Sequence, residues 1–313
     1  MFEANKVKCD TQGLAIDAIK SLLGLSEADV QHLVVRSMSG GVSNNNFLII
    51  LKNSAQWVVK LSKGYVSHGL QKEAQAYKLL ANTSLGLDAR FEEKSLVGHS
   101  GALLLQHVSG QTLNQWQQVP LSALTKALKL VHGVMAGTAG SLLHPRDIQL
   151  NPALTLEKSW RYFSRSNALQ DKQLLNIKAR IAAILSQHQK HFAVISPFSM
   201  VHGDVHPNNL ILNSDNALQL IDWERAHFGD PAFDLVAINW HASGNIIDKE
   251  VHQQLINCYS NDLATQAELQ LRANCWGLFR LLTDYLFLSQ HQLLPHKREQ
   301  FFAEITEHIN GFC

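Results

Sequence analysis

The sequence lacks the features that mark a disordered, membrane-spanning or secreted chain. Its 313 residues are 17% charged and 46% hydrophobic, a balance that excludes a disordered protein. The apolar runs, such as residues 101–105 and 278–288, are short or interrupted, whereas a membrane-spanning helix needs about 20 apolar residues. The N-terminus lacks the basic start and the apolar stretch of a signal peptide. We therefore expect no membrane partner.

The sequence also has few cysteines and almost no net charge. The four cysteines lie far apart and form no Cys-x-x-Cys pair, which predicts free thiols in a reducing cytoplasm. Twenty-seven Lys and Arg residues oppose 26 Asp and Glu residues, so the net charge is +1. Binding to nucleic acid needs a concentrated basic surface, and this balance argues against that class of partner. It does not argue against one small anionic ligand held in a pocket.

The residues that are present form two differently patterned parts. Residues 1–108 contain strand-length apolar runs, including a hairpin signal at residues 47–61, around one helical stripe at residues 70–80. Later residues have mostly helical periodicity, for example at 233–240, but residues 199–222 indicate strand, loop, strand, turn and strand. We predict an α+β fold. A small antiparallel sheet with a helix forms residues 1–108, and a larger, mostly helical part forms residues 109–313.

Two acids and an amide stand close together in the strand-rich interruption. The segment His202-Gly203-Asp204-Val205-His206-Pro207-Asn208-Asn209 precedes a predicted hairpin that ends at Asp222. A four-residue turn at 214–217 would place Asn209 opposite Asp222 at the open end of that hairpin. Asp204 lies one loop earlier, at the same edge. Such oxygen ligands suit a hard cation such as Mg²⁺, and a carboxylate among them can also act as a base.

Two other interpretations of this segment stay open. His202, Asp204 and His206 could simply cap a loop, or they could bind a transition metal as a His-x-Asp-x-His set. The chain has 16 histidines, so chance clusters are common. Phosphoryl transfer needs a cation on the phosphates and a carboxylate that accepts the proton of the attacking hydroxyl. The following Pro207-Asn208-Asn209 and the paired Asp222 fit that chemistry better than either alternative.

The segment resembles the aminoglycoside phosphotransferase and choline kinase superfamily, which is related to the protein kinases. The matching residues are His202-Gly203-Asp204-x-x-x-x-Asn209, Ile221-Asp222-Trp223-Glu224 and Gly229-Asp230-Pro231-x-x-Asp234-Leu235. The resemblance implies a bilobal, protein-kinase-like fold, with residues 1–108 as the ATP-binding lobe and 109–313 as the catalytic and substrate lobe. It makes Asp204 the catalytic base and Asn209 and Asp222 ligands of Mg²⁺. Asp234 is expected to brace the catalytic loop rather than touch the substrate.

The resemblance also implies nucleotide contacts in residues 1–108. Lys60, in the apolar run Trp57-Val58-Val59-Lys60-Leu61, is expected to contact the α- and β-phosphates of ATP. Glu73, thirteen residues later on the predicted helix, is expected to hold Lys60. Taken alone, each residue would be interpreted as a solvated surface charge.

A Gly-rich loop precedes the Lys60 strand. Its backbone amides could cradle phosphates, although a polar hairpin turn would have a similar sequence. It is similar to the loop of choline- and thiamine-kinase-like proteins, and the chain contains neither the G-x-G-x-x-G motif of protein kinases nor a P-loop. The candidate nucleotide-binding residues in this loop and in the connector expected at the adenine are Ser39, Gly40, Gly41, Ser43, Asn44, Gln106 and Val108.

The acceptor is less constrained by the sequence. Gly229-Asp230-Pro231 follows Asp222 too closely for the activation loop of a protein kinase, which favours a small hydroxyl-bearing acceptor. Glu224 and aromatic side chains could bind a cation, although helical spacing is more typical of core residues; the aromatic candidates are Tyr162, Trp223, Trp240, Trp276, Phe279 and Tyr285. The resemblance favours choline, ethanolamine or thiamine. An aminoglycoside or sugar acceptor, or a non-catalytic nucleotide-binding pseudokinase, is the alternative. GTP in place of ATP and the oligomeric state stay open.

Overall fold

The computed structural model of the chain describes residues 11–38, 44–63, 68–93, 100–144, 150–163, 171–238, 247–290 and 298–312. The chain divides into two compact units. Met1–Gly110 and Ile221–Ala226 form the N-terminal unit, whereas Gln111–Leu220 and His227–Cys313 form the C-terminal unit. The segment Ile221–Ala226 thus belongs to the first unit although the chain on either side of it belongs to the second.

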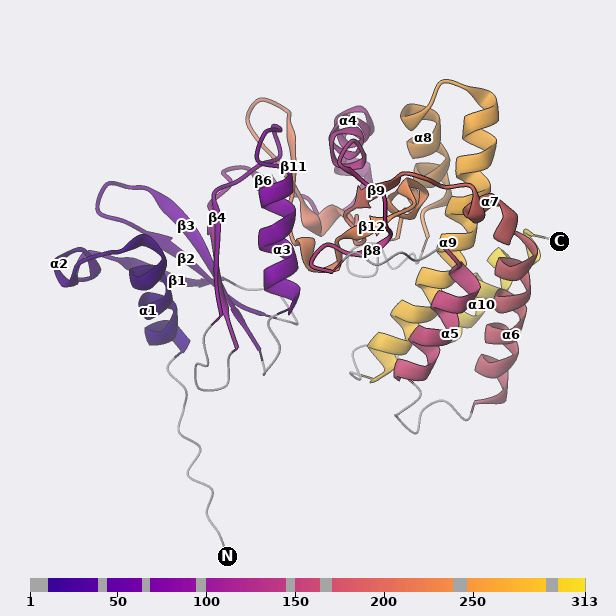
Figure 1. The fold of residues 1–313 in the computed structure, drawn as a ribbon, viewed down its shortest axis with the longest axis horizontal. Helices are drawn as coiled ribbons and strands as arrows, with labels where there is room; N and C mark the ends of the chain where they lie inside the picture. The colour runs from indigo at the N-terminus through magenta and orange to yellow at the C-terminus, as the bar shows by residue number, and fades with distance from the viewer. Residues whose placement is uncertain are drawn as a thin grey trace, which may run out of the picture. The chain divides into compact units, whose positions relative to one another are not determined.

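The N-terminal unit is built on a five-stranded antiparallel sheet with the strand order β1-β2-β3-β5-β4 (Figure 1). The predicted hairpin is confirmed, because β2 pairs with β3 from Asn44 opposite Ser62 to Ile50 opposite Gln56. The turn between these strands contains Ser54 with a φ of 64°. The strands are β1 (Val34–Met38), β2 (Asn44–Ile50), β3 (Gln56–Ser62), β4 (Ala89–Glu92) and β5 (Ala102–Gln106).

Successive side chains of β3 face opposite sides of the sheet, and a different helix packs on each side. Val59 and Leu61 join an apolar core with helix α1 (Thr11–Leu23). Lys60 lies between them and therefore projects from the other face of the sheet. Helix α3 (His68–Leu79), the predicted helical stripe, packs on β4 and β5 and supplies the ion-pair partner of Lys60. The alternation explains how one cation is buried in a strand that is otherwise apolar.

The C-terminal unit combines helices with two small antiparallel sheets. Its sheets have the orders β11-β10-β6 and β7-β9-β12-β8. Their strands are β6 (Gln111–Thr112), β7 (Met135–Ala136), β8 (Gly140–Ser141), β9 (Phe198–Val201), β10 (Leu210–Leu212), β11 (Leu218–Leu220) and β12 (His227–Gly229). The helices are α4 (Leu121–His132), α5 (Pro152–Phe163), α6 (Lys172–Gln187), α7 (Gln189–Ala193), α8 (Lys249–Tyr259), α9 (Leu263–Gln290) and α10 (Arg298–Asn310). In the part of the chain that the structure describes, no helix has the length and apolarity to cross a membrane.

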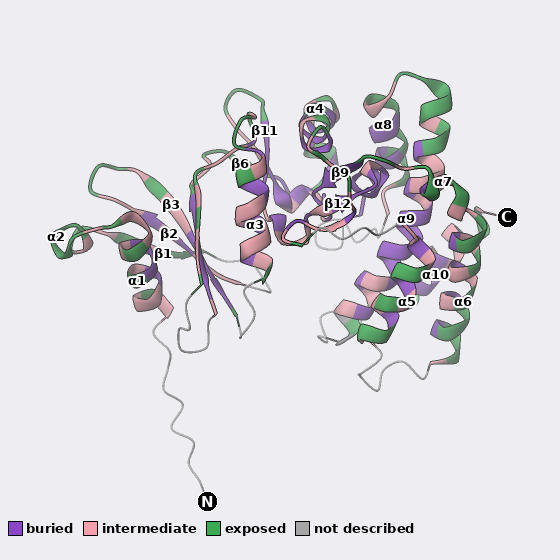
Figure 2. Cartoon of the chain, viewed as in Figure 1, coloured by how far each residue is buried: buried purple, intermediate pink, exposed green. Residues whose placement is uncertain are grey.

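Helix α9 organises the packing of the C-terminal unit. It contacts α5, α6, α8 and α10, and also the short 3₁₀ helix η5 (Pro231–Leu235). Figure 2 shows many buried positions along α9. Among the side chains of this helix that the structure describes, the buried apolar ones are Leu269, Ala273, Cys275, Trp276, Leu278, Phe279, Leu281, Leu282 and Leu286. A polar side chain on its inner face is therefore surrounded by apolar neighbours.

The helix predicted at residues 233–240 is wrong. Over residues 233–238, the part of this range that the structure describes, the chain forms only η5, and Ile238 then makes an isolated antiparallel bridge with Ile247. Ala232, Phe233 and the apolar residues from Leu235 to Ile238 are all buried. The segment is apolar because tertiary contacts bury it on several sides. This apolar pattern resembles that of a helix, which explains the wrong prediction.

Two cysteines support the prediction of free thiols. Cys258 is an exposed free thiol and Cys275 is a buried one. Burial raises the pKa of the Cys275 thiol to about 12, so this side chain stays protonated at neutral pH. Cys9 and Cys313 lie outside the described residues.

The buried His252 and the half-buried His308 in the C-terminal unit predict a loss of stability in acid. His252 of α8 and His308 of α10 each bury an Nε2 atom that has no hydrogen-bond partner among the described residues. Burial lowers the pKa of each to about 4, with a further lowering by His308 at His252 and by Lys249 at His308. The unfolded chain protonates near 6.5 instead, so it binds more protons than the folded chain between pH 6.5 and 4. The free energy of unfolding should fall across that window, by roughly 3 kcal/mol per histidine at most.

Urea unfolding at pH 7 and pH 5 measures this effect. The variant His252→Leu should lose less unfolding free energy on acidification than the wild-type chain does. His32→Leu, at an exposed position, is the matched control and should keep the wild-type pH dependence. An equal loss in the wild type and in His252→Leu would show that these histidines do not govern the acid response.

Candidate active site

In the N-terminal unit, Lys60 lies between two carboxylates. Its Nζ donates to both Glu73 oxygens, at 2.9 Å to Oε1 and 2.8 Å to Oε2, and to Asp222 Oδ1 at 3.0 Å. Glu73 is fully buried, whereas 37% of the Asp222 side chain is exposed. The structure therefore brings together three of the residues selected from the sequence. Neither Lys60 nor Glu73 is the solvated surface charge that the sequence alone allowed.

The electrostatics of this group keep Lys60 charged. Burial lowers the pKa of the Lys60 ammonium, but the charges of Glu73 and Asp222 outweigh that effect and raise the pKa above its ordinary value. Burial also raises the pKa of Glu73 to about 7, although the charge of Lys60 opposes the rise. One cation is shared by two acids, so the buried carboxylate is only partly compensated. Glu73 is the member of the group that takes up a proton most readily when the cation is removed.

Asp222 reaches Lys60 from an unusual backbone conformation. Its φ and ψ are 68° and 63°, in the left-handed region that non-glycine residues rarely occupy. It begins the 3₁₀ helix η4 (Trp223–Arg225), which contacts α3. Such a backbone costs of order 1 kcal/mol and persists only where the surroundings impose it.

Trp223 does not supply the aromatic contact considered for a cationic acceptor. Its side chain is fully buried in the N-terminal unit and packs edge-on against Tyr77 of α3, with ring centroids 6.1 Å apart. This packing anchors η4 to α3 and so places Asp222. Trp276 and Phe279 are also buried and pack on each other in the C-terminal unit. They are the core residues that helical spacing favours.

In the C-terminal unit, a buried carboxylate holds the loop after β9. Asp234 accepts the backbone N–H of His202 at 2.7 Å and that of Gly203 at 2.8 Å. Gly203 has a φ of 81°, which glycine adopts without strain. The bracing role predicted for Asp234 is confirmed.

Asp234 is itself held by a chain of side chains that the sequence did not reveal. His132 of α4 places Nε2 3.1 Å from Asp234 Oδ2, and its Nδ1 lies 2.7 Å from the Tyr259 hydroxyl of α8. Burial raises the pKa of Asp234, but the hydrogen bond and charge of His132 and the contacts of the loop outweigh it and lower the pKa below its usual value. The carboxylate is therefore ionised and fixed at neutral pH.

Asp204 follows in this loop and contacts three other polar residues. Arg280 of α9 donates from Nη2 to Asp204 Oδ1 at 3.2 Å, and His206 Nε2 lies 3.7 Å from Oδ2. Asn209 donates from Nδ2 to the Asp204 backbone carbonyl at 3.0 Å. The amide nitrogen of Asn209 thus faces the loop. Sequence reasoning did not select Arg280, although a lone cation in the run Leu278-Phe279-Arg280-Leu281-Leu282 was a usable signal.

His202 of the loop makes a hydrogen bond within the protein. His202 is fully buried and its Nδ1 accepts the backbone N–H of Asp204 at 3.2 Å. Within the described ranges, no three His, Cys, Asp or Glu side chains converge in a way that could hold a metal ion. His202 is therefore a packing and hydrogen-bonding residue of the loop.

The predicted register of the hairpin is wrong by one residue. The observed pairs are Leu210 with Leu220 and Leu212 with Leu218. The Asn213 side chain accepts the backbone N–H groups of residues 215 and 217, which closes a shorter turn than predicted. The register therefore does not place Asn209 opposite Asp222. A metal ion shared by these two residues stays a prediction from the family resemblance.

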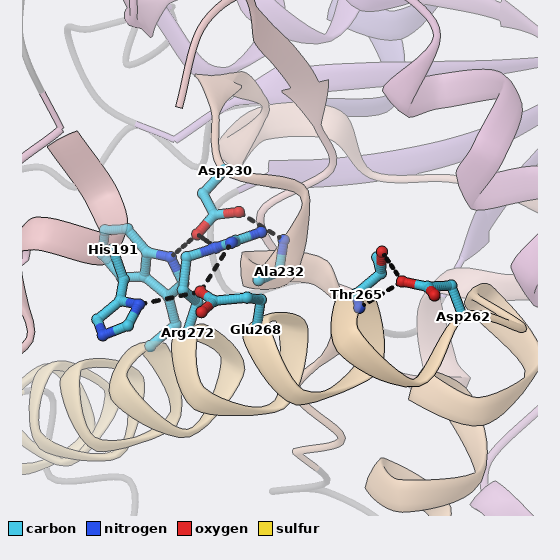
Figure 3. A network of polar contacts seen from close by, with 8 residues as sticks. His191, Asp230, Ala232, Asp262, Thr265, Glu268 and Arg272 are labelled. Carbon is cyan, nitrogen blue, oxygen red and sulfur yellow. Dashed lines mark hydrogen bonds and ion pairs between the residues drawn. The ribbon is translucent and has the colours of Figure 1, made fainter. Parts of the chain in front are cut away.

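The motif Gly229-Asp230-Pro231 is anchored to α9. Asp230 accepts the Ala232 N–H through Oδ1, and Oδ2 accepts from Arg272 Nε and Trp276 Nε1, each at 3.0 Å. Figure 3 shows this network and its extension through Glu268 to His191. These contacts fix the chain just before η5, which carries Asp234.

The remaining predicted nucleotide contacts are only partly described. Ser39, Gly40, Gly41 and Ser43 lie outside the described residues, and Asn44 begins β2. Gln106 ends β5 with an exposed side chain, and its backbone N–H donates to Asp88 at 2.9 Å. Val108 is half-buried beyond the strand. The binding roles of these residues stay predictions.

Two curated proteins are similar to this chain in sequence. LicA of Haemophilus influenzae is 25% identical over 242 residues, which cover 74% of this chain and 64% of that protein. Thiamine kinase of Escherichia coli is 42% identical over 90 residues, which cover 29% of this chain and 28% of that enzyme. The chain therefore spans less than two thirds of the length of these curated relatives.

Solved structures show the same fold. Choline kinase LicA from Streptococcus pneumoniae superimposes with a TM-score of 0.66 at 17% identity, covering 96% of this chain and 99% of that one. Aminoglycoside phosphotransferase APH(4)-Ia also gives a TM-score of 0.66, at 14% identity over 96% of this chain and 98% of that one. The predicted α+β, kinase-like fold is confirmed. Because residues 34–271 match the phosphotransferase enzyme family, the chain belongs to that family.

Proposed function

We propose that this protein transfers the γ-phosphoryl group of ATP to the hydroxyl of a small molecule. The observation that carries the proposal is the loop after β9. Its backbone is held by the ionised, buried Asp234 and by the Asn209 side chain, and it carries the Asp204 carboxylate that Arg280 contacts. Membership of the phosphotransferase enzyme family supports the same chemistry.

Asp204 is proposed to act as the general base. The acceptor oxygen forms a bond to the γ-phosphorus while the bond from that phosphorus to the leaving ADP oxygen breaks. The hydroxyl proton passes to the Asp204 carboxylate. A base must be held in place to do this, and the hydrogen bond from Arg280 Nη2 holds one oxygen of the Asp204 carboxylate.

The N-terminal unit is proposed to bind the nucleotide phosphates. Lys60 is a permanent cation that Glu73 holds from one side. An ammonium fixed in this way offers a preorganised positive charge to phosphate oxygens. The Gly-rich loop at residues 39–44 would add backbone donors.

Asn209 and Asp222 have the chemistry to hold Mg²⁺. A carboxylate and an amide are hard oxygen donors, and the hydrogen bond from Asn209 Nδ2 to the loop commits the nitrogen rather than the oxygen of that amide. When bound, Mg²⁺ neutralises charge that develops on the phosphates.

For the acceptor, we propose a cationic alcohol such as choline, ethanolamine or thiamine. The support comes from the relatives, which include a choline kinase, an ethanolamine kinase and thiamine kinases. Aminoglycosides are the alternative, because an aminoglycoside phosphotransferase has the same fold. Among the aromatic candidates, Tyr162 of α5 is largely exposed and Tyr285 stacks on Phe301, while Trp240 lies outside the described residues.

An assay that compares four acceptors tests the proposal. The purified chain is supplied with MgATP and with choline, ethanolamine, thiamine or a kanamycin-like amino sugar, and ADP release is measured for each. We expect the highest kcat/KM for one of the three cationic alcohols. Preference for an uncharged sugar or a multi-ring amine would overturn the cationic alcohol and leave the kinase proposal standing. No ADP release above the acceptor-free background with any acceptor would contradict the kinase proposal itself.

A further inference from the structure

Arg280 is a buried cation in the middle of helix α9. Only 2% of its surface is exposed, and its neighbours in sequence are apolar on both sides. Burying an arginine is costly unless the guanidinium is paired and hydrogen-bonded. Its partner should therefore be functionally or structurally important.

The carboxylate of Asp204 is the polar partner of Arg280. Nη2 donates to Asp204 Oδ1 at 3.2 Å, and the guanidinium carbon lies 5.5 Å from the centre of the Phe233 ring in η5. Nε and Nη1 are buried and have no hydrogen-bond acceptor among the residues that the structure describes. The position of this cation thus depends on one aromatic face and on the carboxylate proposed as the base.

The same helix contains a second arginine, which is half-buried and pairs with a different carboxylate. Arg272 lies about two turns earlier on α9 and pairs with Asp230, which also caps η5. That pair links helix α9 to the start of η5. Arg280 differs because the carboxylate it contacts lies in the candidate catalytic loop and is partly exposed.

We infer that Arg280 is a positioning residue for Asp204. It holds one carboxylate oxygen and balances the negative charge, so that the other side of the carboxylate keeps a fixed direction toward the acceptor hydroxyl. This role rests on the proposed function, because it presumes that Asp204 is the base. Arg280 itself acts through Asp204 and does not need to touch the substrate.

A double-mutant cycle tests this role in the full-length chain. Steady-state kinetics with MgATP and the best acceptor are measured for the wild type, Arg280→Met, Arg280→Lys, Asp204→Asn and Asp204→Asn/Arg280→Met. Arg280→Met should lower kcat about 10- to 100-fold and leave the KM for ATP within about twofold, because it removes positioning rather than nucleotide binding. Arg280→Lys should recover part of kcat, since it keeps the charge.

The double variant separates positioning from structure. If Arg280 acts through Asp204, adding Arg280→Met to Asp204→Asn should lower kcat by less than about threefold, because the two effects are not additive. Arg272→Met is the matched control. Arg272→Met should lower the melting temperature. Any loss of kcat that it causes should appear in full when it is combined with Asp204→Asn, so that the two fold-losses multiply.

The outcomes are distinguishable. A further 10-fold or larger loss in the double variant, or no loss of kcat in Arg280→Met, would overturn the positioning role while leaving the kinase proposal intact. A wild-type chain that phosphorylates none of the acceptors would overturn the proposed function and this inference with it.

Discussion

Replacing Asp204 by asparagine should lower kcat at least about 10²-fold, the lower end of what loss of a general base costs. The asparagine has the same shape and can still accept the hydrogen bond from Arg280, so the loop should keep its conformation. It cannot take the proton of the acceptor hydroxyl. The KM for ATP and the binding of ADP should stay close to the wild-type values.

The control for this variant is Asp215→Asn, the same substitution in the exposed turn of the β10–β11 hairpin. It should leave kcat unchanged. Kinetics with the best acceptor and calorimetric titration with ADP check both variants. Wild-type turnover in a folded Asp204→Asn protein would remove Asp204 from the chemistry.

Replacing Lys60 by methionine should lower kcat/KM for MgATP by about 10²-fold or more, because a preorganised charge on the phosphates is lost. The loss of folding free energy should be much smaller. Burial already raises the pKa of Glu73 to about 7, and without Lys60 this carboxyl can remain protonated in the folded chain. A neutral Glu73 avoids the penalty of an unpaired buried charge.

The protonation of Glu73 gives this variant a second measurable property. Its folded pKa lies above that of the unfolded chain, so the unfolded chain releases the proton at lower pH. The free energy of unfolding of Lys60→Met should therefore fall as the pH rises from about 5 toward 8. Urea unfolding measures this slope, and Lys52→Met at the exposed β2–β3 turn is the control. If Lys60→Met used MgATP as well as the control does, the phosphate-binding role would be wrong.

The sequence predicted the parts of the candidate site that local patterns encode. Lys60 stands in a five-residue apolar run and Glu73 on a helical stripe, so periodicity placed each on its element, while the family resemblance paired them. The bracing role of Asp234 came from the resemblance of its motif to the family's, and its two backbone contacts agree with that prediction. The α+β class followed from the change in periodicity after residue 108.

Contacts made by tertiary packing could not be predicted in the same way. Arg280, His132 and Tyr259 come from three separate helices, and nothing in their local sequence indicates which side chain each of them contacts. The burial of Trp223 against Tyr77 likewise depends on how η4 returns to the N-terminal unit. Such contacts link residues that are far apart in the sequence.

The hairpin register shows how a single side chain can change a topological prediction. Counting a four-residue turn ignored the hydrogen bonds that the Asn213 side chain makes to the turn backbone. Asn216 adopts a φ of 56° to complete the shorter turn. A slip of one residue turns every later side chain to the other face of a strand. The link between Asn209 and Asp222 therefore has to be tested by metal binding rather than by register.

The central claim is that Asp204 and Lys60 serve one transfer of phosphate from ATP to a small alcohol. The most direct measurement is the stoichiometry of products, with ADP and the phosphomonoester of the acceptor quantified in the same reaction. We expect equal amounts of both from the wild-type chain, with formation of both lost together in Asp204→Asn. Tight nucleotide binding with neither product, the behaviour of a pseudokinase, would contradict it.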